Sequence, residues 1–195
     1  DVMLDKYYFG KVDRISPEAP VPIVNIQKEE SRLGGASNVA NNIVSLGGHS
    51  LLCGVIGHDL FGKEIERISR HKNIDTFLLK TSSPTITKAR IIGGKQQIVR
   101  VDYEDKSELN ADNKKLFRDT ISRILPEYDI LVISDYGKGL ISEDLCRYLI
   151  KLAHKYDKKV IIDPKGKNWE KYSGADIVTP NVKELSDIVG YTVPN

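Results

Sequence analysis

Cysteine, long apolar runs and an excess of one charge are all missing from this sequence. Its 195 residues include only two cysteines, Cys53 and Cys146, both in apolar surroundings. They are typical of reduced core residues and indicate the cytoplasm. No apolar run approaches the roughly 20 residues of a membrane span. No signal peptide is visible either, but the abrupt beginning at Asp1 leaves targeting open. The net charge is +2 without a long basic run, so nucleic-acid binding has no electrostatic support.

Two common nucleotide-binding motifs are absent as well. The chain has neither a Walker A sequence nor a G-x-G-x-x-G turn. An obvious P-loop or Rossmann site is therefore excluded. The content of 40% hydrophobic and 29% charged residues is ordinary for a globular protein. The length predicts one domain.

The second half of the sequence alternates between strand and helix patterns. A helix is predicted over residues 111–125, with Leu116, Phe117, Ile121 and Ile124 facing inward. A second helix begins at Ser142 and buries Leu145, Leu149 and Leu152, and a third covers 182–189. Buried strands are predicted at 129–134, 160–162 and 175–179. This alternation predicts an α/β fold with a parallel sheet.

A polar cluster follows each of these strands, at residues 134–139, 163–166 and 179–184. Ligands bind beyond the carboxyl ends of strands in open α/β sheets, so all three clusters are expected at one binding edge. Carboxylates and lysines there suit phosphates and a divalent metal. Structural alternatives stay open. Asp135 and Gly139 could be turn residues, Asp163-Pro164 could be a plain strand-to-loop junction, and Asn181 and Glu184 have the spacing of a helix capping box.

The first half is organised around the stretch Gly34-Gly35-Ala36-Ser37-Asn38, which opens an amphipathic helix. Glycines leave no Cβ to block a ligand, and a helix N-terminus offers unpaired N–H groups. We expect a close-approach surface for a polyol, with Asn38 donating and accepting hydrogen bonds. The alternative is a tight loop that only caps the helix. The helix itself, from about Ser37, is expected to bury Val39, Ile43 and Leu46.

A buried strand is predicted at 51–56, and a helix from about Leu60 that buries Ile65 and Ile68. Residues 85–92 and 96–101 flank Gly93-Gly94 and have a hairpin signature. The strand at 21–26 follows a proline-rich segment, which confines it to a sheet edge or a lid. We expect the hairpin to pair with this strand as a small β lid, formed by approximately residues 11–30 and 76–103. Residues 1–10 carry Asp1 and Asp5 with no strand ahead of them.

These motifs resemble the ribokinase-like (PfkB) carbohydrate kinases. The resemblance is carried by Gly34-Gly35-Ala36-Ser37-Asn38-Val39-Ala40, Leu46-Gly47, Gly54, Gly57, Asp59 and Gly62, and in the second half by Asp135-Tyr136-Gly137-Lys138-Gly139, Asp163-Pro164-Lys165 and Asn181-x-x-Glu184. It implies a three-layer α/β/α fold with a mostly parallel sheet and a β lid. It also implies ATP and Mg²⁺ as cofactors.

Within that family, residues 1–7 and 14–22 are most similar to the D-glycero-β-D-manno-heptose-7-phosphate kinase domains of bifunctional ADP-heptose synthases. Such domains phosphorylate O1 of the sugar phosphate, in ADP-heptose and lipopolysaccharide core biosynthesis. Two alternatives remain. One is another ribokinase-like kinase, for fructose 6-phosphate, ribose or a nucleoside. The other is a non-catalytic sugar-binding fragment.

The resemblance also assigns candidate site residues. Asp1, Gly34, Gly35 and Asn38 would hold sugar hydroxyls, with Asp5 a weaker candidate. Arg100, and after it Arg90 or Lys88, would bring a cation over the sugar from the lid, although Arg100 could instead belong to a solvated strand face. Asn181 and Glu184 would organise Mg²⁺ and the ATP phosphates through water. Asp163 and Lys165 are second-rank candidates at the same edge.

Two departures from the family pattern matter. The strand that precedes the Gly-Asp pair in the family is missing, and so is the Gly-Ala-Gly-Asp turn that carries the general base. We therefore expect a single kinase domain that is incomplete at both ends, and no catalytic base is assigned. The lid offers an apolar face near Val21, Ile23, Ile98 and Val101, and such surface is usually covered. In the kinases that the chain resembles two lids clasp each other, which implies a homodimer.

Overall fold

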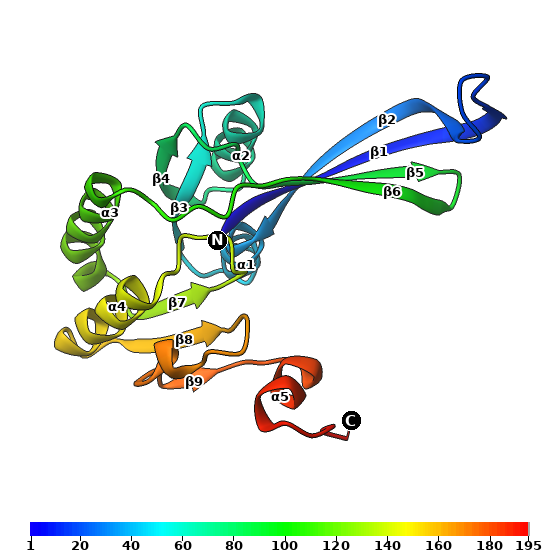
Figure 1. Ribbon diagram of the computed structural model, residues 1–195. Coiled ribbons are helices and arrows are strands. Elements are labelled where there is room, and N and C mark those ends of the chain that lie inside the picture. Colours follow the sequence, from blue (N-terminus) through cyan, green and yellow to red (C-terminus); the bar gives the residue numbers. More distant parts are fainter. Residues whose placement is uncertain (195) are drawn as a thin grey trace. The chain divides into compact units, whose positions relative to one another are not determined.

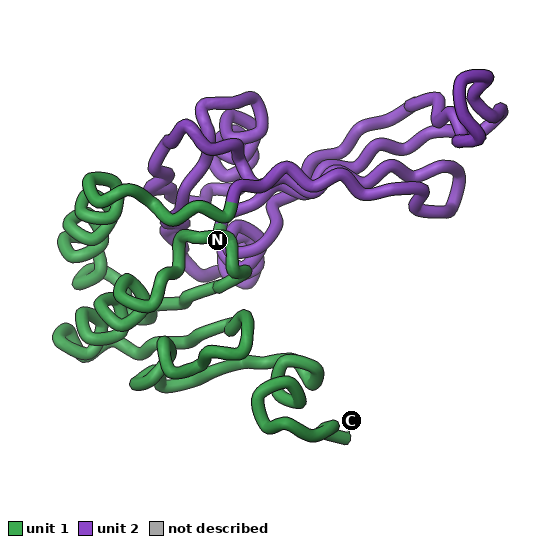
Figure 2. Tube along the Cα trace, in the orientation of Figure 1, with its two compact units in different colours: residues 1, 106–195 green, residues 2–105 purple. Residues whose placement is uncertain are grey.

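A computed structural model describes residues 1–194 of the chain. It divides into two compact units (Figure 2). The N-terminal unit comprises residues 2–105, and the C-terminal unit comprises Asp1 together with residues from 106 onward. Each unit is described by itself below.

Two sheets and two helices form the N-terminal unit (Figure 1). Its elements are β1 (Val2–Ile15), β2 (Pro22–Gly35), α1 (Ala36–Ser45), β3 (Leu51–Gly57), α2 (Leu60–His71), β4 (Asp75–Thr81), β5 (Thr87–Gly93) and β6 (Gln96–Tyr103). Four strands make the lid sheet in the order β2-β1-β5-β6, while β3 and β4 pair in parallel. In Figure 1 the four lid strands extend as a long ribbon away from α1 and α2.

The lid sheet confirms the predicted β5–β6 hairpin and the edge position of the proline-flanked strand β2. The direct pairing of the hairpin with β2 is wrong, and the strand over residues 2–15 was not predicted. The 14-residue strand β1 lies between them, antiparallel to β2 and parallel to β5. Its charged residues hid it, because residues 5–9 are half-buried on both faces and residues 11–15 are exposed, so the apolar alternation of a strand with one buried face is absent.

The core of this unit gathers where β1 and β2 meet the helices. Its buried members are Val2, Leu4, Leu33, Ala40, Leu52, Ile56, Ile65, Ile68 and Ile74. Helix α2 buries Ile65 and Ile68 as predicted. For α1 the predicted buried stripe is wrong, since Ser37 and Ala40 are buried whereas Leu46 is 89% exposed. Small side chains let the helix lie close to the sheet, while Val39 and Ile43 are only half-buried.

The C-terminal unit confirms the predicted alternation of strand and helix. Its elements are α3 (Ala111–Ile124), η1 (Leu125–Glu127), β7 (Ile130–Ser134), α4 (Glu143–Lys155), β8 (Lys159–Asp163), η2 (Glu170–Tyr172), β9 (Ile177–Val178) and α5 (Val182–Val189). The strands pair in parallel in the order β7-β8-β9. Helix α4 buries its three predicted leucines.

Two details of this unit differ from expectation. Leu116 in α3 is 46% exposed, because the buried side of the helix is formed by Phe117, Thr120 and Ile121. Strand β7 is buried on one face only, with Ile130 and Val132 exposed on the other.

Both cysteines carry free thiols. Burial raises the pKa of Cys146 to about 11 and that of Cys53 to about 12, so neither thiol is reactive at neutral pH. Cys146 is fully buried, as predicted, while Cys53 is half-buried. In the part of the chain that the structure describes, no helix combines the length and apolar character needed to cross a bilayer.

Candidate functional site

The Gly34-Gly35 pair ends β2 and leads directly into α1. Gly35 has a φ of 55°, the left-handed region that favours glycine, and no side chain caps the helix that follows. Gly34 has a different role, since a Cβ at this position would lie 2.5 Å from Oδ2 of Asp5. The first glycine therefore makes room for a carboxylate. Asn38 is exposed in the first turn of the uncapped helix, as a ligand contact requires.

The register of the lid sheet places four of the eight predicted substrate-binding residues on one face. Strand β1 aligns Asp5 with Lys88 and Tyr7 with Arg90, and the hairpin aligns Arg90 with Arg100. Because paired residues project to the same side and the side alternates along a strand, these side chains share a face. Nη1 of Arg90 donates to Oδ1 of Asp5 at 2.6 Å, and both side chains are 21% exposed. The face thus carries a fixed carboxylate beside several cations.

Two residues of this face were not identified from the sequence. The ring of Tyr7 lies under two guanidinium groups, that of Arg32 at 4.8 Å and that of Arg90 at 5.2 Å from the ring centroid. Cations over a tyrosine face are attracted by the ring quadrupole. Tyr7 lies two residues from Asp5 and Arg32 lies two residues from Gly34, a spacing that puts side chains on the same face of a strand. This could be used only once both segments were known to be strands.

The contacts of Arg100 are those of a residue on a solvated strand face, the alternative to a role in substrate binding. Its guanidinium makes two hydrogen bonds to Asp102, at 2.8 and 2.9 Å, and its side chain is 48% exposed. A charged pair of this kind is typical of an exposed strand. A role in binding a phosphate stays a prediction for Arg100 and for Lys88.

In the C-terminal unit, the three predicted polar clusters follow β7, β8 and β9 at the carboxyl edge of the parallel sheet. Nζ of Lys165 donates to Oε1 of Glu184 at 2.9 Å, which connects the second cluster to the third. Asn181 and Glu184 also form a complete capping box, with hydrogen bonds of 2.9 and 3.1 Å. Asn181 and Glu184 therefore cap helix α5, and a further role in binding Mg²⁺ and ATP stays a prediction.

The charges at this edge influence one another. Burial, and after it the carboxylate of Glu184, raise the pKa of Asp163. Burial opposes ionisation of Glu184, but hydrogen bonds from Lys165 and from the Asn181 N–H lower its pKa. The hydrogen bond to Glu184 raises the pKa of Lys165. The edge thus brings the carboxylates of Asp163 and Glu184 and the ammonium of Lys165 together, groups that suit a divalent cation and phosphate oxygens.

Asp135 and Gly139 act structurally here. Oδ1 of Asp135 accepts from the Gly137 N–H at 2.7 Å, the pattern of an Asx turn, and Gly139 has a φ of 97°. Asp1 belongs to the same unit: its Oδ2 accepts from the N–H groups of Tyr136 at 2.8 Å and Lys138 at 3.2 Å. The structure thus groups Asp1 with the loop after β7, while Gly34, Gly35 and Asn38 lie in the N-terminal unit.

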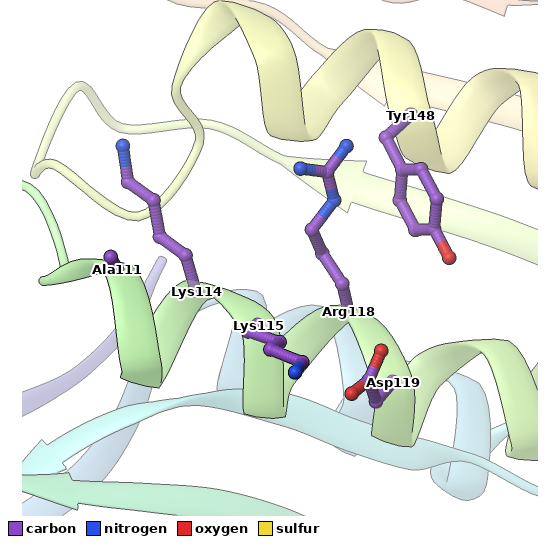
Figure 3. A pocket seen from close by; sticks show the side chains of 6 residues that line it. All are labelled: Ala111, Lys114, Lys115, Arg118, Asp119 and Tyr148. Atoms are coloured by element: carbon purple, nitrogen blue, oxygen red, sulfur yellow. The ribbon is translucent and has the colours of Figure 1, made fainter.

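Two further features bear on ligands. A hollow of about 400 Å³ lies between α3 and α4, where the guanidinium of Arg118 faces the ring of Tyr148 (Figure 3). The hollow is lined by Ala111, Lys114, Lys115, Arg118, Asp119 and Tyr148. Among the described residues, no three His, Cys, Asp or Glu side chains lie close enough to hold a metal by themselves.

Comparison with known proteins identifies the family. A model of the pfkB family of carbohydrate kinases matches residues 6–193. The bifunctional protein HldE of Helicobacter pylori strain P12 is 46% identical over 187 residues, which cover 95% of this chain and 41% of that protein. The D-beta-D-heptose 7-phosphate kinase of Bordetella bronchiseptica is 45% identical over 191 residues, 97% of this chain and 60% of that protein. The chain thus spans only part of these relatives.

The fold has known counterparts too. The tetrameric inhibited form of phosphofructokinase-2 from Escherichia coli matches with a TM-score of 0.74 at 21% identity, over 100% of this chain and 63% of that one. At this identity the likeness concerns the fold alone, and it confirms the expected ribokinase-like α/β fold. Because the family model spans both units, the chain belongs to the pfkB family of carbohydrate kinases.

Proposed function

We propose that this chain is the kinase part of a protein that transfers the γ-phosphate of ATP to O1 of D-glycero-β-D-manno-heptose 7-phosphate. The product would be the 1,7-bisphosphate, an intermediate on the way to ADP-heptose and the lipopolysaccharide core. One observation carries the proposal: 45% identity over 97% of this chain to a protein named as a heptose 7-phosphate kinase. The two units would then belong to a single kinase domain.

The polar face of the lid sheet supports a substrate that already carries a phosphate. Hydroxyl groups would be held by Gly34, Gly35 and Asn38, with the free oxygen of Asp5 as a further acceptor. Arg90 and Arg100 would meet the phosphate, since planar guanidinium groups match phosphate oxygens. Tyr7 and its flanking Arg32 enlarge this candidate surface.

The carboxyl edge of the C-terminal unit supports nucleotide binding. The carboxylates of Asp163 and Glu184 suit Mg²⁺, which would neutralise charge on the ATP phosphates. Both oxygens of Glu184 already accept hydrogen bonds, so Glu184 and Asn181 would hold the ion through water molecules. Lys165 would contact phosphate oxygens. These residues bind and orient, which is most of what phosphoryl transfer asks of a protein.

The assembly and compartment follow as proposals. Val21, which precedes β2, and Ile98 and Val101 in β6 are between 37% and 51% exposed, and two lids in contact would cover them. A homodimer through the lid sheet is therefore proposed. Two free thiols and an ATP-dependent reaction agree with the cytoplasm.

A direct assay tests the proposal. The full-length protein is given Mg²⁺ and ATP with heptose 7-phosphate, fructose 6-phosphate, ribose or a nucleoside in parallel. We expect the highest kcat/KM for heptose 7-phosphate, and a preference for one of the others would overturn the assignment. Asn38→Ala should raise the sugar KM about tenfold through the loss of a hydrogen bond. Asn42→Ala, one turn further along α1 at another exposed position, is the matched control and should leave KM unchanged.

A further inference from the structure

One tyrosine hydroxyl joins two of the strand-end loops of the C-terminal unit. Tyr172 lies in η2 and is buried. Its hydroxyl donates to Oδ2 of Asp135 at 2.7 Å and accepts from the backbone N–H of Lys165 at 2.9 Å. The carbonyl of Lys165 lies 3.1 Å from the same hydroxyl. The loop after β7 and the loop after β8 are thus held together through a single side chain.

The acceptor of this hydroxyl is itself fixed. Asp135 is 2% exposed and receives two further hydrogen bonds, from the N–H of Gly137 and from the ammonium of Lys171. A buried carboxylate needs such partners, because an unpaired charge in the interior is strongly unfavourable. Burial is the main cause that raises the pKa of Tyr172, and the Asp135 carboxylate adds to it. The hydroxyl therefore keeps its proton and remains a donor.

The backbone that Tyr172 holds belongs to a residue that reaches the third loop. Nζ of Lys165 donates to Oε1 of Glu184 in the first turn of α5. The side chain of Lys165 is 49% exposed, so its ammonium can turn to a ligand, whereas its backbone cannot shift without breaking the contact with Tyr172. Lys165 and Glu184 were proposed above to serve the nucleotide, but Tyr172 itself lies too deep to touch it.

We propose that Tyr172 is a positioning residue for nucleotide binding: its hydroxyl fixes the backbone of Lys165, so that the Lys165 ammonium and Glu184 stay in the arrangement that ATP phosphates require. This inference rests on the proposed function. Small displacements of positioned groups reduce phosphoryl transfer strongly, because the protein contributes geometry and charge more than covalent chemistry.

The test compares three variants of the full-length protein. Tyr172→Phe removes only the hydroxyl, and we expect it to raise the KM for ATP about tenfold with the sugar KM unchanged. Tyr148→Phe removes the hydroxyl of another half-buried tyrosine of the same unit, on α4 beside the hollow in Figure 3, and should change neither KM. Asp135→Asn breaks the ion pair with Lys171 but leaves an amide that still bonds the Tyr172 hydroxyl.

Thermal unfolding of the same variants separates positioning from stability. Asp135→Asn should lower the unfolding temperature more than Tyr172→Phe, yet leave the KM for ATP closer to that of the wild type. If the KM for ATP instead rises in proportion to the loss of stability, or if both KM values rise together, Tyr172 is only structural. An unchanged KM for ATP in Tyr172→Phe would overturn the proposal as well.

A binding measurement keeps this inference separate from the proposed reaction. If the wild type phosphorylates none of the sugars, the proposed function fails. Titration with a non-hydrolysable ATP analogue and Mg²⁺ then still decides the role of Tyr172. Weaker binding by Tyr172→Phe than by Tyr148→Phe supports it, and equal binding rejects it.

Discussion

Replacement of Gly34 by alanine should destabilise the N-terminal unit, although the backbone at this position does not demand glycine. The φ of Gly34 is not in the left-handed region, so an alanine can adopt its backbone conformation. Replacing a glycine by alanine at such a position usually stabilises the fold by about 0.5–1 kcal/mol, because the unfolded chain loses conformational freedom. A net loss would therefore reveal a steric conflict. Such a conflict is expected, since the new Cβ would lie 2.5 Å from Oδ2 of Asp5 and 2.9 Å from Cγ of Met3.

The size of the loss follows from what must move. Overpacking a tight site costs about 1–3 kcal/mol. Asp5 can retreat only by weakening its 2.6 Å contact with Arg90, a partly buried charged hydrogen bond that contributes about 1 kcal/mol. We expect Gly34→Ala to lower the free energy of unfolding by about 2 kcal/mol after the backbone gain is subtracted.

Urea denaturation of four proteins measures this: the wild type, Gly34→Ala, Asp5→Ala and the double variant. In the Asp5→Ala background the closest clash is gone, so the same substitution should cost about 1 kcal/mol or less. The sugar KM of Gly34→Ala should also rise, because the carboxylate is displaced. An equal cost in both backgrounds, or a stabilised Gly34→Ala, would refute the steric reasoning.

Four further outcomes are expected. Burial acts to raise the pKa of Asp59, but hydrogen bonds to its carboxylate outweigh burial and lower the pKa. The stabilisation that the ionised Asp59 gives the fold is full above an ordinary aspartate pKa of about 4 and is lost as the pH falls below it. The difference in unfolding free energy between wild type and Asp59→Asn should therefore shrink from pH 7 to pH 3, and a constant difference would contradict this. Glu184→Gln keeps a good capping residue, so it should change the free energy of unfolding by less than about 0.5 kcal/mol while weakening ATP binding. Glu184→Ala should weaken ATP binding and also lose about 1 kcal/mol of stability. If both variants bind ATP as tightly as the wild type, Glu184 serves only as a helix cap. Arg100→Ala should raise the sugar-phosphate KM about tenfold with little change in urea midpoint. The control Lys95→Ala, in the hairpin turn, should leave both the KM and the urea midpoint unchanged. Val101→Glu should convert the proposed dimer to a monomer in light scattering, and a wild-type monomer at high concentration would reject the lid interface.

Local patterns predicted the C-terminal unit well. Its helices are amphipathic, its strands are short apolar runs, and the Asn181–Glu184 spacing predicted the start of α5 at the observed residue. These features depend on neighbours in the chain, so periodicity and capping chemistry suffice to find them. The β5–β6 hairpin was visible for the same reason.

Long-range pairing hid the rest. Strand β1 has charged and aromatic residues in its middle part, Asp5–Phe9, which is half-buried on both faces, so its sequence gives no sign of a single buried side. Tyr7 joins Arg32 and Arg90 only through the register of three strands. The links of Tyr172 to Asp135 and Lys165 span 37 and 7 residues, and a sequence pattern does not indicate which tyrosine closes them.

The length of β1 has a mechanical consequence. One unbroken strand runs from Val2 in the core to Ile15 at the exposed end, about 45 Å at the usual rise per residue. The lid sheet is therefore joined to the core of the N-terminal unit through a continuous strand, with no hinge loop at its base. The pairing of β1 with β2 is irregular at Phe9/Gly10 and again at Val12/Arg14, in the outer half of the strand, so bending is expected there. Bending in that outer half leaves Asp5 and Arg90, which lie between it and the core, in their paired arrangement.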